Sequence, residues 1–480
     1  MQGLMKTPLS PAPNNLYLSQ TSSRWKSIGS MLGLVTVIFF FVNTALFIVS
    51  GFVDSNLNGI LGPSDPIQVM IGTLCSTPFL LAFILLRKPK LAHIVRVEPT
   101  NQGTTNHLIA PSTLIQTTMQ TSVKHHLVHN TAPLQIPPFK QLWLIFIIGT
   151  LISTICMIPI LISSTIWAVL LLLLISIPAW IVGFSTPVFA WWATSNEYFG
   201  LQTTKRQGEW MLIAGMLSTF PALVINSLIS PIIITFLGIS MDGVESLGYG
   251  MILFLSAPIG EELSKALAIL FLSRFIDSGK RGFQIGFSVG LGFALLENMS
   301  YILGAIFSGE GAAVSFIFTT VLRAIGSIPG HATWTAISGY AIGHHIAKNN
   351  NSKSFIDGIH EKRKVIKQET QWALFDKKTG QLISSSSVKV KPILPKWLSA
   401  GKEKEIPLTK SPSKAIFIAI LCHSIWNGTL WISGKLLIDS PAIIQITVNL
   451  TLIITLIAIL WIILRRLIPY AIDDGNSILS

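Results

Sequence analysis

Three charged residues lie within five positions of an otherwise apolar stretch, SAPIGEELSKALAILFLSR, at residues 256–274. At about 100° per residue, Lys265 lies one turn beyond Glu261 and Glu262 on the same side of a helix, so its ammonium can reach both carboxylates. One lysine cannot neutralise two carboxylates, so either a carboxyl group holds a proton or a further cation lies nearby. If the stretch crosses a membrane, each charge costs about 2.5–3.5 kcal/mol, which indicates proton-transfer chemistry or a structural ion-pair network.

A second apolar stretch, GFQIGFSVGLGFALLENMSY, ends in an acid and an amide, Glu297 and Asn298. Before them, small residues recur at every fourth position: Gly282, Gly286, Gly290 and Ala294. A stripe of small residues lets a neighbouring backbone approach closely. Because an unpaired carboxylate deep in an apolar helix is costly, we expect Glu297 to face the interior of a helical bundle.

Two more apolar stretches share the spacing His-x-x-Trp. In VLRAIGSIPGHATW, His331 lies about two turns after Arg323 and one turn before Trp334. In AILCHSIWNGTLW, one helical face carries His423, Trp426 and Asn427. A lone histidine in such a stretch is more often a hydrogen-bonded core residue than a ligand. Two such elements beside two acidic helices indicate one shared site.

Helix breaks directly precede two of these motifs. Pro258 and Gly260 come just before the acidic pair, and Pro329 and Gly330 come just before His331. Proline releases a carbonyl group in the preceding turn, and irregular backbone at membrane depth is tolerated where it lines a cavity or is buried in protein. We therefore expect a site that water or substrate can reach.

The composition is that of a membrane protein. Half of the 480 residues are hydrophobic and 11% are charged, against about 25% charged residues in ordinary soluble domains. The net charge of +13 comes from basic residues in the connections between apolar blocks, as in cytoplasmic loops, so no nucleic-acid partner is expected. The three cysteines lie inside apolar blocks without paired spacing, which excludes a disulfide framework.

The sequence predicts an all-α fold, a polytopic transmembrane helical bundle of about ten spans in the lipid bilayer. The expected spans are 31–51, 66–86, 142–163, 166–192, 210–237, 248–273, 282–306, 314–346, 415–434 and 441–463. Lys and Arg concentrate in alternate connections, which predicts that both termini are cytoplasmic.

The expected organisation has five parts. They are a disordered cytoplasmic N-terminus (1–30), N-terminal membrane helices (31–240), the first part of a functional core (248–346), a basic flexible insertion (348–414) and two closing helices (415–466). The cytoplasmic loop 87–141 and the insertion lack sustained periodicity, so both are expected to be flexible or weakly folded. The loop's histidines, His125, His126 and His129, could bind a metal, but a solvated loop is the favoured interpretation.

Four motifs in this order resemble the PrsW family of intramembrane proteases, which is distantly related to CAAX prenyl endopeptidases and bacteriocin-immunity-type membrane proteases. They are Glu-Glu-x-x-Lys at 261–265, Phe-x-x-x-Glu-Asn at 293–298, His-x-x-Trp at 331–334 and His-x-x-Trp-Asn at 423–427. The resemblance covers roughly residues 250–430 and leaves out the first five spans, the loop 87–141 and the insertion 348–414.

The resemblance implies hydrolysis of a peptide bond in or near a transmembrane segment of a membrane-protein substrate. It maps the family's catalytic positions onto Glu261, Glu262, Glu297, His331 and His423. It also implies a bacterial cytoplasmic membrane and a single-span regulator, such as an anti-sigma factor, as substrate. A prenylated tail is the substrate that the distant relatives would imply instead.

The residues leave the role of a metal open. The chain has no Gly-x-Ser-x-Gly and no His-Glu-x-x-His, so a water activated by glutamate is the expected nucleophile. In one version His331, His423 and Glu297 hold Zn²⁺, and Glu262 or Glu261 is the general base. In the other, Glu262 takes the proton of the water directly and the imidazoles orient the water or protonate the amine.

The remaining polar residues are assigned supporting roles. Asn427 is the expected amide donor to the oxyanion, so it belongs to the predicted catalytic set. Lys265 and Arg323 are expected to hold carboxylates, and Asn298 lies beside Glu297 on the small-residue stripe. Trp334 and Trp426 are expected to form packing or cavity wall.

Two other function classes fit part of the pattern. A proton-coupled transporter or channel would use the same buried Glu, Lys and His groups as a relay. Transporters of this length often carry matching broken helices in both halves, whereas here the polar groups lie in the second half. A membrane scaffold that binds partners through its basic loop would leave the intramembrane charges unexplained.

Overall fold

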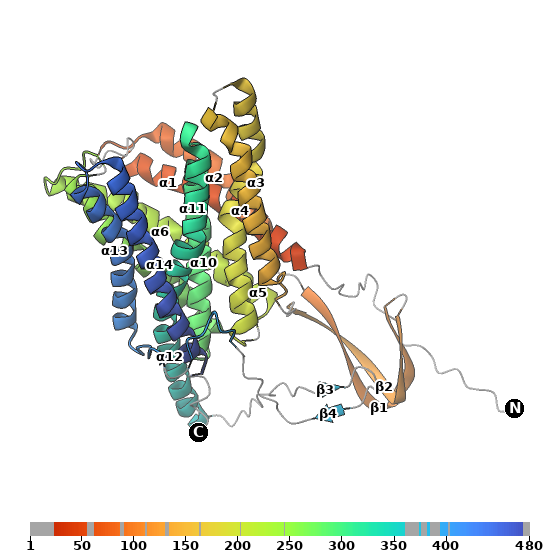
Figure 1. The fold of residues 1–480 in the computed structure, drawn as a ribbon. Coiled ribbons are helices and arrows are strands. Elements are labelled where there is room, and N and C mark those ends of the chain that lie inside the picture. Colours follow the sequence, from red (N-terminus) through yellow and green to blue (C-terminus); the bar gives the residue numbers. More distant parts are fainter. Residues whose placement is uncertain are drawn as a thin grey trace.

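The structure is a computed structural model of the 480-residue chain. It describes residues 24–54, 62–86, 91–110, 113–129, 134–162, 165–201, 203–243, 245–360, 374–375, 382–384, 394–401 and 404–473. Long helices run roughly side by side and form a bundle (Figure 1). The predicted all-α, polytopic bundle is confirmed.

The first half of the bundle is built from seven helices and one π-helical turn. They are α1 (Arg24–Val53), α2 (Pro66–Leu86), α3 (Phe139–Ile162), α4 (Ile166–Tyr198), α5 (Lys205–Leu217), α6 (Thr219–Val224), the π-helical η1 (Ile225–Ile229) and α7 (Ser230–Phe236). Helix α1 begins at Arg24, so residues 24–30 are helical rather than part of the disordered N-terminus that the sequence predicts. Residues 1–23 lie outside the described part of the chain.

The second half carries the sequence motifs. It consists of α8 (Leu247–Met251), the π-helical η2 (Ile252–Ser256), α9 (Ala257–Phe271), a 3₁₀ turn η3 (Ser273–Phe275), α10 (Gly279–Ile306), a 3₁₀ turn η4 (Gly309–Gly311), α11 (Ala312–Leu322), the π-helical η5 (Arg323–Ser327), α12 (Ile328–His360), α13 (Pro412–Leu436) and α14 (Ala442–Asp473).

Nine helical segments of the described chain are long and apolar enough to cross a membrane. The sixth predicted span, 248–273, is not among the nine, although it is helical from Leu247 to Phe271. Its three charged residues, Glu261, Glu262 and Lys265, lower its hydropathy, and their burial shows that the bundle rather than lipid surrounds them. The prediction of about ten spans agrees with nine apolar helices and this polar one.

Helix α10 packs closely against α12 through the predicted stripe of small residues. A Cβ atom added at Gly290 would lie 2.7 Å from Cα of Ala332, and one added at Gly286 would lie 2.9 Å from Cα of Ala336. Because no side chain separates the two helices here, their backbones touch. The contact brings His331 on α12 next to the part of α10 that leads to Glu297.

Each π-helical turn ends two residues before a proline. Segment η1 precedes Pro231, η2 precedes Pro258 and η5 precedes Pro329. Proline lacks an N–H group and its ring clashes with the carbonyl four residues earlier, so the widened π-helical turn relieves a local conflict. The predicted breaks before the acidic pair and before His331 are therefore π-helical turns within continuous helices.

Part of the loop 87–141, predicted to be flexible or weakly folded, is a β-hairpin instead. Strand β1 (Leu91–Ala110) pairs antiparallel with β2 (Thr113–His129), outside the helical bundle (Figure 1). The two strands are rich in Thr, Val and Ile, which fit an extended chain well, although their alternation is too irregular to detect. The side chains of His125, His126 and His129 lie outside the described part, so their metal binding stays untested.

The insertion 348–414 is not wholly flexible either. Helix α12 continues to His360, and short strands β3 (Leu374–Phe375) and β4 (Leu382–Ser384) pair with each other. Near its end, Leu398 is fully buried and Trp397 packs against Trp191 and Trp461. The end of the predicted flexible segment, around Trp397 and Leu398, therefore packs against the helical bundle through apolar contacts. Residues 361–373, 376–381, 385–393 and 402–403 lie outside the described part.

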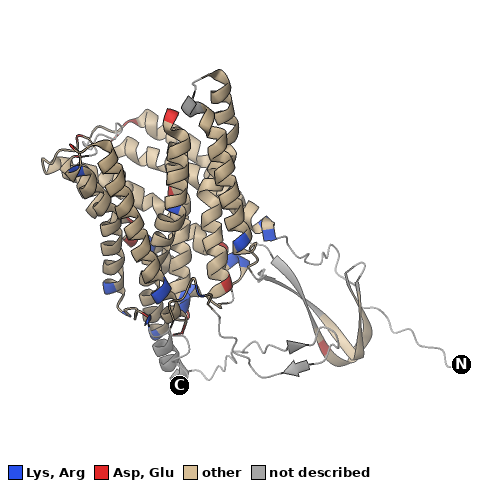
Figure 2. Cartoon of the chain, viewed as in Figure 1, with Lys and Arg blue, Asp and Glu red and all other residues tan. Residues whose placement is uncertain are grey.

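The connections predicted to be cytoplasmic meet at one end of the bundle. Arg281 Nη1 donates to Thr203 Oγ1 at 3.3 Å, and Arg465 Nη2 donates to the carbonyl of Lys396 at 2.9 Å. Figure 2 shows that most described Lys and Arg residues gather at this end. This common end supports the predicted alternation of loops, while the side of the membrane on which the termini lie stays a prediction.

Candidate active site

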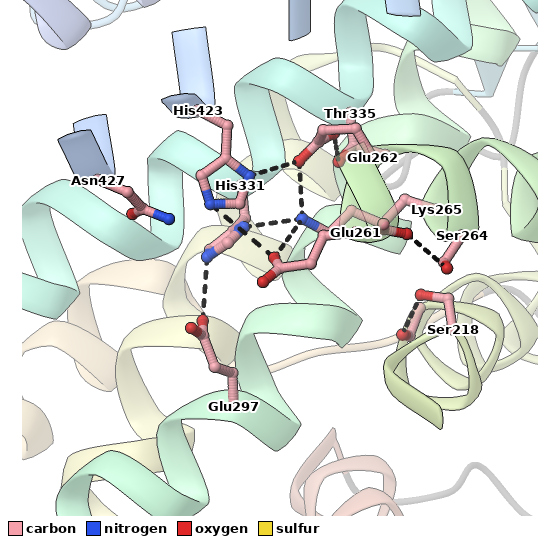
Figure 3. A network of polar contacts seen from close by, with 12 residues as sticks. Ser218, Glu261, Glu262, Ser264, Lys265, Glu297, His331, Thr335, His423 and Asn427 are labelled. Carbon is pink, nitrogen blue, oxygen red and sulfur yellow. Dashed lines mark hydrogen bonds and ion pairs between the residues drawn. The ribbon is translucent and has the colours of Figure 1, made fainter. Parts of the chain in front are cut away.

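Four helices bring the sequence motifs together inside the bundle. Helix α9 supplies Glu261, Glu262 and Lys265, α10 supplies Glu297, α12 supplies His331, and α13 supplies His423. These side chains point toward one another and form one connected network (Figure 3). The sequence placed them on separate helices, and the fold brings them within hydrogen-bonding reach.

Lys265 is the centre of the network. Its side chain is completely buried, and its Nζ donates to Glu262 Oε1 at 2.8 Å and to Glu261 Oε2 at 3.4 Å. The same ammonium lies 2.9 Å from His331 Nδ1, and 3.9 Å from the centre of the Phe293 ring. An ammonium has no acceptor, so His331 Nδ1 must accept this hydrogen bond. The predicted reach of Lys265 to both carboxylates is confirmed.

Glu262 is fully buried, and it forms hydrogen bonds with three neighbouring side chains. Besides Lys265, its Oε1 lies 3.1 Å from His423 Nδ1, and its Oε2 accepts from Thr335 Oγ1 at 3.4 Å. A carboxylate only accepts, so His423 Nδ1 carries the proton and His423 Nε2 presents a lone pair. Glu262 therefore fixes the tautomer and the orientation of His423.

Glu261 differs from Glu262 because it lines a cavity. Its Oε2 lies 3.9 Å from His423 Nε2, which is too long for a hydrogen bond. The carboxylate and this nitrogen are both acceptors, so they can bind a water molecule, which donates one hydrogen to each, or a cation. This pair is the part of the network with room for a reactant.

Glu297 holds the other side of His331. Its Oε2 lies 3.0 Å from His331 Nε2 and accepts from Arg323 Nη2 at 2.6 Å. Arg323 also donates through Nε to Asn298 Oδ1, and its guanidinium stacks 4.0 Å from the centre of the Tyr301 ring. The expectation that Arg323 and Asn298 support Glu297 agrees with these contacts.

Three carboxylates and two permanent cations make up the charge of the network. Glu261, Glu262 and Glu297 face Lys265 and Arg323. With neutral histidines, one negative charge is left in a buried place, where unpaired charge is costly. A proton or a bound metal cation would supply the balance. Arg323 pairs with Glu297, so it does not neutralise the second carboxylate of the pair Glu261 and Glu262.

A group of three buried residues could hold a metal ion, and it differs from the predicted one. The donor atoms of Glu261, His331 and His423 all lie within 4.8 Å of one another. The predicted group has Glu297 in place of Glu261. Glu297 pairs with Arg323 and also lies 3.0 Å from His331 Nε2, so the choice between the two carboxylates as ligand stays a prediction. Helical spacing shows which residues share a face, but it does not give distances between helices, so it could not choose between the two carboxylates.

A cavity of about 950 Å³ adjoins the network. Glu261, Glu297, His331, His423 and Asn427 line it, whereas Glu262 and Lys265 are not among its lining residues. Its lining also includes Glu245, just before α8, and Lys435, near the end of α13. The volume is large enough for a peptide segment of several residues.

Structural contacts are made by the two tryptophans predicted to support the site and by Asn427, which the sequence analysis predicts as the amide donor to the oxyanion. Trp334 stacks on His423, with ring centres 4.7 Å apart, and lies 6.0 Å from Trp426, as expected for packing and cavity wall. Asn427 Nδ2 donates to the carbonyl of Leu253 at 3.3 Å. Since Leu253 belongs to η2, Asn427 satisfies a carbonyl group that the π-helical turn releases.

Sequence reasoning missed two tryptophans that hold the backbone before His331. Trp191 Nε1 donates to the carbonyl of Ala324 at 3.1 Å, and Trp461 Nε1 donates to the carbonyl of Ile325 at 2.9 Å. Both carbonyls belong to η5, one turn before Pro329. Pro329 predicts that carbonyl groups in the preceding turn lose their helical hydrogen bonds. No pattern in the sequence shows that Trp191 and Trp461, more than 130 positions away, bind these carbonyl groups.

Comparison with known protein families agrees with this geometry. Residues 206–358 match the sequence model of the family described as PrsW family intramembrane metalloprotease. This part of the chain is a PrsW-family region. No curated protein and no solved structure shows significant similarity to the chain.

The PrsW-family region contains three of the four motifs. It runs from α5 into α12 and includes Glu261, Glu262, Glu297 and His331. His423 lies outside it on α13, yet it contacts Glu262 at 3.1 Å and completes the network. The chain has helices long and apolar enough to cross a membrane several times, and residues 206–358 are similar to intramembrane metalloproteases, in agreement with the resemblance that the motifs carry.

Proposed function

We propose that the chain hydrolyses a peptide bond in or near the transmembrane segment of a membrane protein, and that Glu261 is the carboxylate that activates the attacking water. The observation that carries this proposal is the pair Glu261 Oε2 and His423 Nε2, two acceptors 3.9 Å apart on the cavity side of the network. Glu262, the other candidate for the base, is enclosed and forms hydrogen bonds with three neighbouring side chains.

The proposed reaction begins with a water held between these two acceptors. Glu261 takes one proton as the oxygen attacks the substrate carbonyl, and the same proton can then pass to the leaving amine. Lys265 and Arg323 hold the carboxylates in place through their ion pairs. His423, oriented by Glu262 and stacked on Trp334, holds the lone pair of Nε2 toward the water.

Glu261, His331 and His423 would also be the residues that hold a metal ion, and His331 would exchange its hydrogen bond with Lys265 or Glu297 for the bond to the metal. Two imidazoles and one carboxylate form a donor set typical of catalytic zinc, and the carboxylate of Glu262 on His423 Nδ1 is the support that metal-binding histidines usually have. Zinc, when bound, would lower the pKa of a water molecule toward neutrality. With Glu261 bound to the metal, Glu297 would be the carboxylate that lies beside the metal site on the cavity wall.

The substrate class that fits the cavity is a membrane-spanning segment. The cavity joins the network to one end of the bundle, and its wall is formed by membrane helices α1, α10, α12 and α13. A single-span regulatory protein, for which the sequence analysis named an anti-sigma factor, has a segment of this kind. A bacterial cytoplasmic membrane is the proposed location.

A comparison of membrane proteomes tests the proposal. Cells that produce the wild type are compared with cells that produce Glu261→Gln, and Glu310→Gln serves as the control because Glu310 is exposed. We expect at least one single-span protein to be intact with Glu261→Gln and cut near its membrane segment with the other two. Identical proteomes from equally folded proteins would overturn the proposal and favour a proton-coupled transporter.

A further inference from the structure

We propose that Asn226, on the π-helical turn η1, binds the main chain of the substrate peptide at the cleavage site. This inference rests on the proposed proteolytic function and adds a residue that none of the four motifs contains. Asn226 lines the same cavity as Glu261 and His331.

Asn226 lies directly beside the acidic helix. A Cβ atom added at Gly260, the residue before Glu261, would lie 3.3 Å from Asn226 Oδ1. Glycine at this position therefore lets η1 and α9 approach closely and places a carboxamide next to the first catalytic carboxylate. The π-helical turn that carries Asn226 ends two residues before Pro231, as the turns before Glu261 and His331 end before their own prolines.

The Asn226 side chain has a hydrogen-bonding capacity that the described structure does not use. Its Oδ1 is buried and has no hydrogen-bond partner among the residues that the structure describes. An unpaired buried carbonyl group is costly, and such groups cluster at functional sites. Within the described part of the chain, Asn226 both lines the cavity and has a buried oxygen without a hydrogen-bond partner. Asn427 also lines the cavity, but its amide already donates to the carbonyl of Leu253.

The chemistry of a carboxamide matches that of a peptide group, with one acceptor and two donor hydrogens. A transmembrane substrate must lose its helical hydrogen bonds around the bond that is cut, and at membrane depth no bulk water replaces them. The χ2 torsion of asparagine is soft, so rotation can turn Oδ1 or Nδ2 toward the cavity. Asn226 can then accept from a substrate N–H group or donate to a substrate carbonyl.

The test measures substrate binding separately from cleavage. The probe is the single-span protein that accumulates uncut with Glu261→Gln, and its dissociation constant is measured for Glu261→Gln alone and for Glu261→Gln combined with Asn226→Leu. Leucine has a similar size but no polar group. Loss of one buried hydrogen bond predicts about 10-fold weaker binding. In the otherwise wild-type chain, Asn226→Leu is expected to raise KM about 10-fold with little change in kcat.

Asn449→Leu is the matched control. Asn449 lies on α14, its Oδ1 is also buried without a described partner, and it does not line the cavity. Both leucine variants should keep the wild-type unfolding temperature, and the control should keep wild-type affinity and KM. Unchanged binding with Asn226→Leu, or an equal loss in the control, would overturn the role of Asn226. If no protein accumulates with Glu261→Gln, the proposed function fails and this inference fails with it.

Discussion

Glu261 and Glu262 are neighbours in the sequence, yet their surroundings give them different roles. Glu262 accepts from Lys265, His423 and Thr335, and its side chain is inaccessible. Glu261 makes one long contact with Lys265 and faces the cavity. A group that must meet a reactant needs access, and a group that orients others needs enclosure. On this basis we assign the reaction to Glu261 and the support of His423 to Glu262.

The two glutamine variants should therefore differ in stability although both lose activity. Glu261→Gln is expected to reduce the cleavage rate about 10²–10⁴-fold, as for loss of a general base, without changing the unfolding temperature. Glu262→Gln should also lower the free energy of unfolding by about 3–5 kcal/mol, because it leaves the buried Lys265 without its shortest ion pair. Thermal unfolding of both purified variants, with Glu310→Gln as control, measures the difference. Equal unfolding temperatures would contradict the separate roles.

The metal content of purified variants tests the three-residue donor set. In the metal-bound alternative, about one zinc per chain is held by Glu261, His331 and His423, which are the usual number of protein ligands for catalytic zinc, and Glu261 is then a ligand rather than the base. Glu261→Gln should lose the metal and Glu297→Gln should keep it, as elemental analysis can determine. The reverse pattern would restore Glu297 as the ligand. Full activity in a metal-free protein would show that the water is activated by glutamate alone.

At the scale of the helices, close packing and broken hydrogen bonding position the site. The small-residue stripe of α10 holds α12 at backbone contact, and π-helical turns precede both the acidic pair and His331. The carbonyl groups in these turns are bound by Asn427, Trp191 and Trp461. Residues far from the reactants thereby fix the direction in which the catalytic helices enter the site.

Gly290→Ala tests the helix contact. The added Cβ would overlap the backbone of His331 and Ala332, which cannot move aside as a flexible side chain can. We expect a loss of about 1–3 kcal/mol in the free energy of unfolding, as for overpacked cores, together with a strong loss of cleavage. The control is Gly304→Ala in the same helix, where nothing lies within 4 Å of the added atom. A wild-type unfolding temperature for Gly290→Ala would contradict the close approach.

At the scale of the whole molecule, one end of the bundle collects the basic connections and the other end continues the cavity. Lys396 and Arg465 meet at the basic end, while Glu245 and Lys435 line the cavity toward the opposite end. The positive-inside rule predicts that the basic end is cytoplasmic. A substrate segment would then reach the network from the side opposite to both termini.

Thiol labelling in intact cells tests this orientation. In a chain whose three native cysteines are replaced, Ser308→Cys lies between α10 and α11, and Lys396→Cys lies in the docked end of the insertion. Both positions are exposed. A membrane-impermeant maleimide is expected to label Ser308→Cys and to label Lys396→Cys only after the membrane is opened. The opposite labelling pattern would reverse the predicted topology.

Features that depend on neighbours along the chain could be predicted from the sequence, and features that depend on distances between helices could not. The reach of Lys265 to two carboxylates and the small-residue stripe follow from helical periodicity, and the structure confirms both. The exchange of Glu297 for Glu261 beside the histidines, and the hydrogen bonds of Trp191 and Trp461, depend on how separate helices pack. The docking of Leu398 and the β1–β2 hairpin were missed because neither segment has a regular hydrophobic period.

The most direct test of peptide hydrolysis uses the purified protein in lipid vesicles. The single-span protein identified in cells is reconstituted together with the wild type, with Glu261→Gln or with Glu310→Gln, and mass spectrometry determines the termini of the products. We expect one new carboxyl terminus in or near the membrane segment with the wild type and Glu310→Gln, and none with Glu261→Gln. Cleavage that persists with Glu261→Gln, or an uncut substrate with all three proteins, would contradict this expectation.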